Sequence, residues 1–551
     1  MNQPGVPPAQ RPEDPFRRFN ARVLDPTTAL RLPDGSAPYP TVYRGDGMLV
    51  TATTSATART VLNAIDEELK AIKLKRSGPD PFSTETDDPD HNRGALLLRH
   101  AERHQIPLVF PLSIARADDE STDGVDAWPV LRQLRSRRPE IGSAIGLDHL
   151  MFAAVGIGGN PFMAGNPFMA GNPFMAGNPF MAGNPFMAGN PFMAGNPFMA
   201  GNPFMAGNPF MAGNPFMAGN SGVGSYGVAG SGGHGPVKVV LGPPIARNVA
   251  RRPGVVVMDT GIGAHPWFAS DPVRPQLFLA DNTPVGVDVV AGDPTDPEAA
   301  GAIADPLTGL LASHAGHGTF IAGLLRQACP EADLTVLRVM DADGVVPEWR
   351  LNRALTAFAV YLKENPGQVD ALALSLGYYV ETDDDVAYTA GLKDLLAAIA
   401  VQNVTVFASA GNDATERKSY PAAFAVEAPF GGPGTCLLVS VAALNPDGRT
   451  VALFSNDGDW VTAQAVGANV VSTAPTTAQG GWTAGASVID PRQRLRSSID
   501  PDDFSGGFAT WSGTSFAGPV LAGQFVAAVL ADGLASKDIA ARQALATKLL
   551  R

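Results

Sequence analysis

The sequence predicts an α/β protein built on a parallel sheet with helices on both faces, preceded by a smaller α+β domain. In the second half of the chain, short runs rich in Val, Leu and Ala recur: GVVVMD, LTVLRVMD, VDALALSLG, VTVFASAG and CLLVSVAAL. Helical patterns such as LNRALTAFAVYLKEN and TAGLKDLLAAIAVQN lie between them. Apolar strands that alternate with helices are typical of a doubly wound parallel sheet buried on both faces.

The front of the chain predicts a different organisation. Residues 1–38 are rich in Pro and charge, and we expect a disordered arm. Residues 39–157 predict a small domain with three clear strands, TVYRGDGMLVTA, IPLVFPLSIARA and AIGLDHLMFAAV. Two helices, SATARTVLNAIDEELKAIK and DAWPVLRQLRSRRPE, lie between them, the first capped by Ser55 or Thr57. With a weak strand taken from Gly94–His100, the order is β-α-β-β-α-β, a ferredoxin-like sandwich.

An unvaried repeat separates the two parts. Asn-Pro-Phe-Met-Ala-Gly occurs ten times from Asn160 to Gly219, and a Gly/Ser-rich stretch follows it. A residue before Pro is disfavoured in a helix, and Gly-Asn and Asn-Pro favour turns. We therefore expect residues 158–236 to form a partly extended linker and residues 237–551 to form the large domain. A hexapeptide β-solenoid is the alternative, which a Pro in every turn disfavours.

Composition excludes several classes of protein. The net charge is −13, and most of it falls after the repeats, which disfavours nucleic acid and anionic membranes as partners. Two cysteines, Cys329 and Cys436, allow one disulfide but no disulfide framework, and we expect two free, mostly buried thiols instead. No secretory signal or membrane-spanning run stands out, so a cytoplasmic location is expected by default, with non-standard export left open.

Residues capable of chemistry stand at the ends of the predicted strands. Val255–Met258 is followed by Asp259, Ala371–Leu374 by Ser375-Leu376-Gly377, and Val404–Ala408 by Ser409-Ala410-Gly411-Asn412-Asp413. Because ligands of open α/β sheets bind at the carboxyl ends of the strands, these residues are expected on one rim.

Two further segments resemble helix starts. His317-Gly318-Thr319 precedes one apolar helical run, and Gly513-Thr514-Ser515 precedes a longer one. The free backbone N–H groups of a helix N-terminus favour developing negative charge. Asp, His and Ser in this chain order form one of the known orders of the nucleophilic triad. His314 is the alternative base, although it lacks the Gly-Thr and the helix that follow His317.

Six blocks in order resemble the subtilisin-like serine proteases, or subtilases: VVVMDTGIGAHP, GHGTFIAG, ALSLG, FASAGND, ALFSNDGDWVTAQAVGANVVSTAP and SGTSFAGP. They run from about Val255 to Gly523. The resemblance implies a serine endopeptidase with a subtilisin-like fold that needs no cofactor and acts through an acyl-enzyme on protein or peptide substrates. About 45 residues between Phe268 and His317 look longer than the family minimum, so the resemblance does not determine the cleft rim there.

The resemblance also assigns roles. It implies Asp259 as the triad Asp, His317 as the general base, Ser515 as the nucleophile and Asn412 as an oxyanion-hole donor. It implies substrate-binding positions at Ser375, Leu376, Gly377, Ala410 and Gly411. Structural calcium is common in the family, and the acidic run Asp383-Asp384-Asp385 is a candidate, with a solvated loop as the alternative.

Subtilases often carry an N-terminal ferredoxin-like prodomain, and the front domain is similar to one in size and element order. On that analogy the chain is a zymogen and GLDHLMFAA is an inhibitory tail, added as a strand beside Ser375–Gly377. An unrelated accessory domain is the alternative. The repeats are then a tether, a cleavage site for Ser515 in cis or in trans, a multivalent interaction module or scaffold, or a precursor that the protease cuts into hexapeptides.

Overall fold

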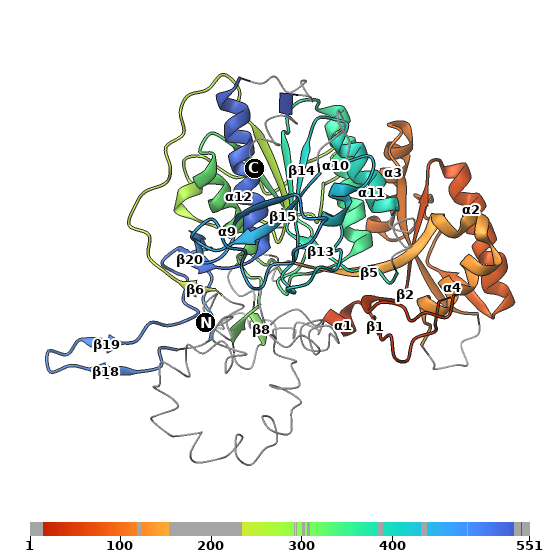
Figure 1. Ribbon diagram of the computed structural model, residues 1–551, viewed down its shortest axis with the longest axis horizontal. Helices are drawn as coiled ribbons and strands as arrows, with labels where there is room; N and C mark the ends of the chain where they lie inside the picture. Colours follow the sequence, from red (N-terminus) through yellow and green to blue (C-terminus); the bar gives the residue numbers. More distant parts are fainter. Residues whose placement is uncertain are drawn as a thin grey trace, which may run out of the picture.

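The computed structural model describes residues 15–32, 34–117, 124–153, 234–290, 293, 295–299, 303–305, 309–382, 390–430, 438–481, 483–533 and 541–542. Its centre is a parallel sheet in the order β10-β7-β12-β14-β15-β16 (Figure 1). The bounds of its strands are β7 Gly254–Asp259, β10 Asp333–Arg338, β12 Ala371–Leu374, β14 Thr405–Ser409, β15 Leu438–Leu444 and β16 Ala463–Val466. All five predicted runs form strands of this sheet, so that prediction is confirmed; β16 was not among them.

Helices cover both faces of the sheet. Along β7, Val255 and Val257 enter the core beneath α9 (His317–Ala328) and α12 (Thr514–Ala531). Val256 and Met258 enter the opposite core, beneath α10 (Glu348–Glu364) and α11 (Ala390–Ala400). Since successive side chains of a strand point to opposite faces, β7 contributes to both cores. Every such Val buried contributes about 1.5–3 kcal/mol to the free energy of unfolding.

Helix α12 is the one helix within the described ranges that is long and apolar enough to cross a membrane. In this structure 67% of that stretch is buried. It packs against α9 and across β12, β14, β15 and β16. The apolar surface of α12 is therefore used inside the domain, as in a core helix of the sheet.

The front domain is an antiparallel sheet with helices packed against it, drawn in orange and red in Figure 1. Its strands lie in the order β5-β2-β4-β3, which is fourth, first, third, second along the chain. The bounds are β2 Thr41–Ala52, α2 Ser55–Ala71, β3 Leu74–Ser77, α3 Pro89–Arg103, β4 Leu108–Arg116, α4 Ala127–Arg137, a 3₁₀ turn at Pro139–Ala144, and β5 Ile145–Ala153. The register of β2 against β5 shifts between Tyr43 and Met48, where β2 carries Gly45-Asp46-Gly47.

The prediction of a strand at Gly94–His100 is wrong, because these residues lie within α3. Asp88 caps that helix by accepting from the backbone N–H of Asp90, and Pro89 occupies its first turn, where its missing N–H costs nothing. Leu97, Leu98 and Ala101 are buried on one side of the helix. The weak strand is instead β3, whose polar sequence LKRS pairs with β4 at the edge of the sheet.

Three smaller expectations also need correction. The arm is structured from residue 15 onward, since α1 (Pro15–Arg18) leads into β1 (Ala21–Leu24), which pairs with β2; residues 1–14 lie outside the described ranges. The cap of α2 is Thr54, whose side chain accepts from the backbone N–H of Thr57. At the end of the expected linker, β6 (Gly235–Pro236) pairs with β20 (Phe508–Trp511), while the hexapeptide repeats lie outside the described residues.

Short elements surround the large sheet. The three-stranded sheet β17-β20-β6 and the hairpins β8/β9 and β18/β19 lie at its margins. Their bounds are β8 Ile303–Asp305, β9 Leu310–Leu311, β17 Val470–Thr473, β18 Ser487–Ile489 and β19 Leu495–Ser497, with 3₁₀ turns at Pro266–Phe268 and Ala422–Val426.

The sheet of the front domain continues into the large domain. Strand β5 pairs on one side with β11 (Val345–Pro347) and on the other with β13 (Leu376–Gly377), so both domains share a seven-stranded sheet. A single apolar core joins Val109 of β4 to Leu355 of α10 and Leu395 of α11. Where α11 meets the front domain, a Cβ on Gly391 would lie 2.5 Å from Thr51 Oγ1 and 3.2 Å from Val109.

Replacing Gly391 with Leu should therefore loosen the contact between the two domains. Leu favours the helix, but its side chain must displace Thr51 and Val109, an overpacking that costs about 1–3 kcal/mol. We expect faster amide hydrogen exchange in the front domain and unchanged exchange in β14 and β15. Gly242→Leu, at a position with open space around it, is the matched control. Equal exchange in the two variants would contradict this account of the interface.

Candidate active site

Asp259 and His317 meet at the carboxyl end of the parallel sheet. Asp259 is the last residue of β7, and His317 is the first residue of α9. The Nδ1 atom of His317 lies 2.7 Å from Asp259 Oδ1, and both side chains are fully buried. The same carboxylate oxygen accepts from the backbone N–H of Thr260 at 2.8 Å. The end of β7 thus positions the carboxylate of Asp259, and the start of α9 positions the imidazole of His317 beside it.

The other ring nitrogen of His317 is available for chemistry. Within the described part of the chain, Nε2 of His317 is buried without a hydrogen-bond partner. The rings of Trp511 and Phe516 pack against the imidazole, each with its centroid 5.3 Å from that of His317. The alternative base, His314, lies with Nδ1 2.8 Å from Ser313 Oγ and stands edge-on to His317 at 5.6 Å. Of the two histidines, His317 is the one joined to Asp259.

Ser515 lies in the first turn of α12, buried beside the end of β12. Its hydroxyl donates to the carbonyl oxygen of Ser375 at 3.2 Å, and the hydroxyl of Ser375 donates back to the carbonyl of Ser515 at 3.0 Å. Phe516, the next residue, contacts the His317 ring. These contacts bring the first turn of α12 beside both the first turn of α9 and the end of β12.

Asn412 is oriented by the residue that precedes Ser515. Its Oδ1 accepts from both the backbone N–H and the hydroxyl of Thr514, each at 2.9 Å. The amide N–H₂ is therefore the end that faces away from Thr514. Gly411 takes φ +108°, and a Cβ there would lie 2.4 Å from Asn456 Nδ2, so the turn requires glycine. The carbonyl of Ala410 accepts from the same Asn456 amide at 2.9 Å.

A buried network that the sequence did not point to supports this turn. Asn456 Nδ2 donates to Tyr379 Oη at 2.9 Å, and Asn456 Oδ1 accepts from the backbone N–H of Asp413 at 2.9 Å. Tyr379 in turn donates to Asp413 Oδ2 at 2.6 Å. Burial, with the charge of Asp413, raises the pKa of Tyr379 well above its usual value, so the hydroxyl keeps its proton and remains a donor. Asn456 lies in the quoted block ALFSNDGDW, but its contacts join loops far apart in the sequence.

Strand β5 occupies the edge offered by the expected substrate-binding residues. Ala153 pairs with Leu376 and Phe152 with Gly377, in antiparallel register. On its other side, Phe152 pairs with Val345, and the backbone N–H of Ala153 donates to the carbonyl of Gly344 at 2.8 Å. Leu376 and Gly377 therefore hold an extended strand in this structure, and that strand comes from the chain's own front domain.

A buried ion cluster fixes β5 in place. His149 lies with Nδ1 2.9 Å from Glu348 Oε2 and Nε2 2.9 Å from Glu381 Oε2, and its ring stacks on Tyr378 at 4.5 Å. Burial alone would lower the pKa of His149, but the two carboxylates outweigh it and raise the pKa to about 10. Burial by itself would raise the pKa of Glu381, but the charge and hydrogen bond of His149 hold that pKa below its usual value. His149 is therefore a cation at neutral pH while β5 is docked.

The residue before His149 on β5 is also a buried ionisable group. Asp148 is fully buried; one of its oxygens lies 3.0 Å from Arg44 Nη1, and the other accepts from the backbone N–H of Trp349 at 3.1 Å. Burial raises the pKa of Asp148 to about 6, against the opposing charge of Arg44. The Trp349 contact attaches β5 to the first turn of α10, where a carboxylate also benefits from the helix dipole.

The described residues contain no candidate metal site and one buried cysteine. Within those ranges, no group of three or more His, Cys, Asp and Glu side chains could hold a metal ion. Cys329 is a buried free thiol, and burial raises its pKa to about 11. The calcium candidates Asp383–Asp385 and the second cysteine, Cys436, lie outside the described residues.

Comparison with known proteins adds a family. The family model described as the subtilase family, Peptidase_S8, matches residues 251–547. Among solved structures, a cold-adapted subtilisin-like serine proteinase is 20% identical over 54% of this chain and 85% of its own, with a TM-score of 0.33. A lanthipeptide protease is 19% identical over 50% of this chain and 72% of its own, with a TM-score of 0.34. No curated protein matches in sequence, and the family assignment rests on the family model.

The His149 cluster predicts how stability depends on pH. Because the folded-state pKa of about 10 exceeds the ordinary 6.5, the stabilisation is fully present below pH 6.5 and is lost as the pH rises through 10. Removing one partner of a buried ion pair costs about 3–5 kcal/mol, so His149→Gln should lower the unfolding temperature markedly at pH 6. The gap between wild type and variant, measured by thermal unfolding, should close toward pH 10. A gap that is constant with pH would contradict the assigned charge.

Proposed function

Because the chain belongs to the subtilase family of serine endopeptidases, we propose that Asp259, His317 and Ser515 are its catalytic triad. The observation that carries the proposal is the buried pair formed by His317 Nδ1 and Asp259 Oδ1 at 2.7 Å, beside the helix start that bears Ser515. A hydroxyl is a weak nucleophile until a neighbouring base takes its proton, and that base needs an orienting carboxylate. These three side chains supply those functions.

The reaction follows from these positions. Ser515 Oγ attacks the carbonyl carbon of the peptide bond while Nε2 of His317 accepts the hydroxyl proton. Asp259 holds the imidazole in the required tautomer and stabilises its positive charge. The proton then passes to the leaving amine, and an acyl-enzyme remains until water attacks it with His317 again acting as base. Subtilases need no cofactor for this chemistry.

We assign the stabilisation of the oxyanion to the amide of Asn412 and the backbone N–H of Ser515. Thr514 supports the first role, since it donates twice to Asn412 Oδ1 and so fixes the orientation of the amide. The position of Ser515 in the first turn of α12 supports the second, because the backbone N–H groups at a helix N-terminus favour developing negative charge. Ser375, Leu376, Gly377, Ala410 and Gly411 are proposed to line the substrate backbone, with Leu376 and Gly377 pairing with it as they pair with β5.

We further propose that residues 39–157 form a ferredoxin-like inhibitory prodomain. The strand order β5-β2-β4-β3 supports this fold, with α3 as an added helix. The pairing of β5 with β11 and β13 supports the inhibition, because a substrate strand and β5 would compete for the same backbone groups. The chain is then a zymogen whose own front domain blocks its cleft.

The position of the repeats makes them the proposed site of release. In the sequence, residues 154–159 and the array 160–219 directly follow β5, whose end pairs beside Ser375. Ser375 is also the residue whose carbonyl accepts from Ser515. Cleavage between residues 154 and 219, in cis or in trans, would separate the front domain from the protease.

Ser515→Ala should abolish this activity. Without the nucleophile, only the residual rate that binding and the oxyanion hole provide should remain. Mass spectrometry should show the intact 57.3 kDa chain for the variant and fragments divided between residues 154 and 219 for the wild type. Turnover of a denatured protein should fall in parallel. An intact wild-type chain would reject release within the repeats, and equal turnover by the two proteins would reject the triad.

Asn412→Ala should slow turnover by about 10²–10³-fold, which is the loss known for removing the one oxyanion-hole side-chain donor of subtilisin itself. The effect should fall on kcat, since the oxyanion exists only in the transition state. Thermal unfolding is the control, because Thr514 also loses its acceptor. A change in KM with kcat unchanged would instead assign Asn412 to substrate binding.

A further inference from the structure

A buried acid in the segment between Phe268 and His317 contacts the residues that follow Asp259 and His317 in the sequence. Glu298 is 2% exposed, and no sequence block pointed to it. Its Oε1 contacts the hydroxyl of Thr260 and accepts from the backbone N–H of Gly318 at 3.0 Å. Its Oε2 accepts from the hydroxyl of Thr319 at 2.5 Å. One carboxyl group therefore joins the residue after Asp259 to the two residues after His317.

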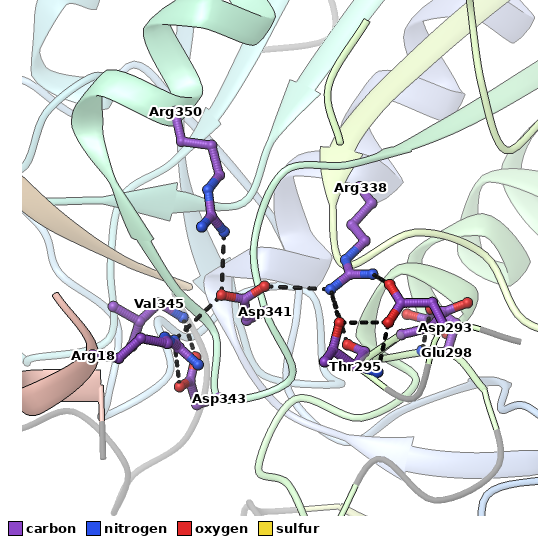
Figure 2. A network of polar contacts seen from close by, with 10 residues as sticks. Arg18, Asp293, Thr295, Glu298, Arg338, Asp341, Asp343, Val345 and Arg350 are labelled. Carbon is purple, nitrogen blue, oxygen red and sulfur yellow. Dashed lines mark hydrogen bonds and ion pairs between the residues drawn. The ribbon is translucent and has the colours of Figure 1, made fainter. Parts of the chain in front are cut away.

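The segment that carries Glu298 is itself anchored. Figure 2 shows Arg338, the last residue of β10, reaching Asp293 and Thr295 on one side and Asp341 on the other. Arg338 Nη1 lies 2.7 Å from Asp293 Oδ2, and Nη2 donates to the carbonyl of Thr295 at 2.9 Å. The backbone N–H of Glu298 donates to Asp296 Oδ1 at 3.0 Å. The segment that carries Glu298 is thus attached, through Arg338, to β10, the strand next to β7.

Counting protons assigns the state of Glu298. Three oxygen–oxygen contacts lie in line: Asp259 with Thr260, Thr260 with Glu298, and Glu298 with Thr319. The two threonine hydroxyls supply two protons, and each can serve one contact. Thr319 donates to Glu298, so the single proton of Thr260 must serve either Asp259 or an ionised Glu298. A proton on Glu298 satisfies all three contacts, because Glu298 then donates to Thr260 and Thr260 donates to Asp259.

We propose that Glu298 is a positioning residue that stays protonated and, through the Thr260 hydroxyl, orients the Asp259 carboxylate toward His317. The inference rests on the proposed triad and adds a residue to it. Asp259 Oδ1 would then receive three donors: the backbone N–H and hydroxyl of Thr260, and Nδ1 of His317. Such donors fix the plane of the carboxylate, and the plane of the carboxylate fixes the imidazole.

The charges around Glu298 agree with a neutral acid. Burial raises the pKa of Glu298 to about 8; the hydrogen bonds from Thr260 and Thr319 oppose the rise, and the charges of Asp259 and Asp296 add to it. Beyond them, Arg338 is already paired with Asp293, and His317 with Asp259. An ionised Glu298 would place a second carboxylate beside Asp259 and withdraw the Thr260 proton from it.

The test uses each protein as purified after expression of the whole chain, whether or not it has been cleaved, and a small fluorophosphonate that reports the reactivity of Ser515. In the labelling step a bond forms between Ser515 Oγ and phosphorus, the phosphorus–fluorine bond breaks, fluoride leaves, and His317 takes the hydroxyl proton. The labelling rate is measured from pH 6 to 10 for wild type, Glu298→Gln, Glu298→Ala and Thr260→Val. Ser515→Ala gives the background, and thermal unfolding at each pH confirms that every variant is folded.

Glu298→Gln should label faster than Glu298→Ala at pH 7, because its amide can donate to Thr260 as the protonated acid does, although an amide nitrogen in place of Oε1 cannot accept from the backbone N–H of Gly318. Glu298→Ala and Thr260→Val should label about 10- to 100-fold more slowly than wild type, which is the loss expected for one hydrogen bond to a charged group. The wild-type rate should fall as the pH rises through about 8, and this fall should be absent in Glu298→Gln.

Other outcomes separate the two proposals. If labelling depends on Ser515 but Glu298→Ala matches wild type, the inference about Glu298 is overturned and the triad stands. The same holds if Glu298→Gln is as slow as Glu298→Ala, or if it keeps the alkaline fall, since a protonated donor is then not what the site needs. If no labelling depends on Ser515, the proposed function is overturned, and the role of Glu298 falls with it.

Discussion

The backbone pairing of β5 on both of its edges is the constraint that organises the molecule. Between β11 and β13, this one strand completes the sheet of the front domain and fills the edge beside Ser375. The front domain therefore cannot move away from α10 and α11 without exposing unpaired N–H and C=O groups along both neighbouring strands. Separation therefore exchanges these strand hydrogen bonds for hydrogen bonds to water, which ties the position of the domain to the state of the cleft.

Charge reinforces the backbone pairing. Burying His149 and Asp148 would be unfavourable if either lacked a partner, and each partner lies on another part of the chain. The cation of His149 needs Glu348 and Glu381, which belong to the large domain, so the cluster is complete only when β5 is docked. Apolar contacts supply most of the affinity between the domains, while these buried pairs make one register of β5 the favoured one.

The residues of the proposed catalytic site are brought together in a different way. Parallel strands end together, and helices α9 and α12 begin there, so Asp259, His317 and Ser515 converge although they are far apart in the sequence. A second layer then fixes their orientation, through Thr514 and Asn456 on the Asn412 side and through Thr260 and Glu298 on the Asp259 side. On each side a threonine donates directly to a residue of the first layer, Thr514 to Asn412 and Thr260 to Asp259.

The sequence by itself determined the five apolar strands, the helix starts at His317 and Thr514, and the residues at the strand ends. These follow from local signals, namely hydrophobic period, capping and composition, which act over a few neighbouring residues. Only the tertiary structure decided that LKRS is an edge strand and that Gly94–His100 is helical, because a polar edge strand is defined by its partner β4. It also decided the contacts of Glu298 and His149. Glu298 lies 38 residues from Thr260, and His149 lies 199 residues from Glu348. Contacts at such separations depend on how the chain packs, and no local pattern encodes them.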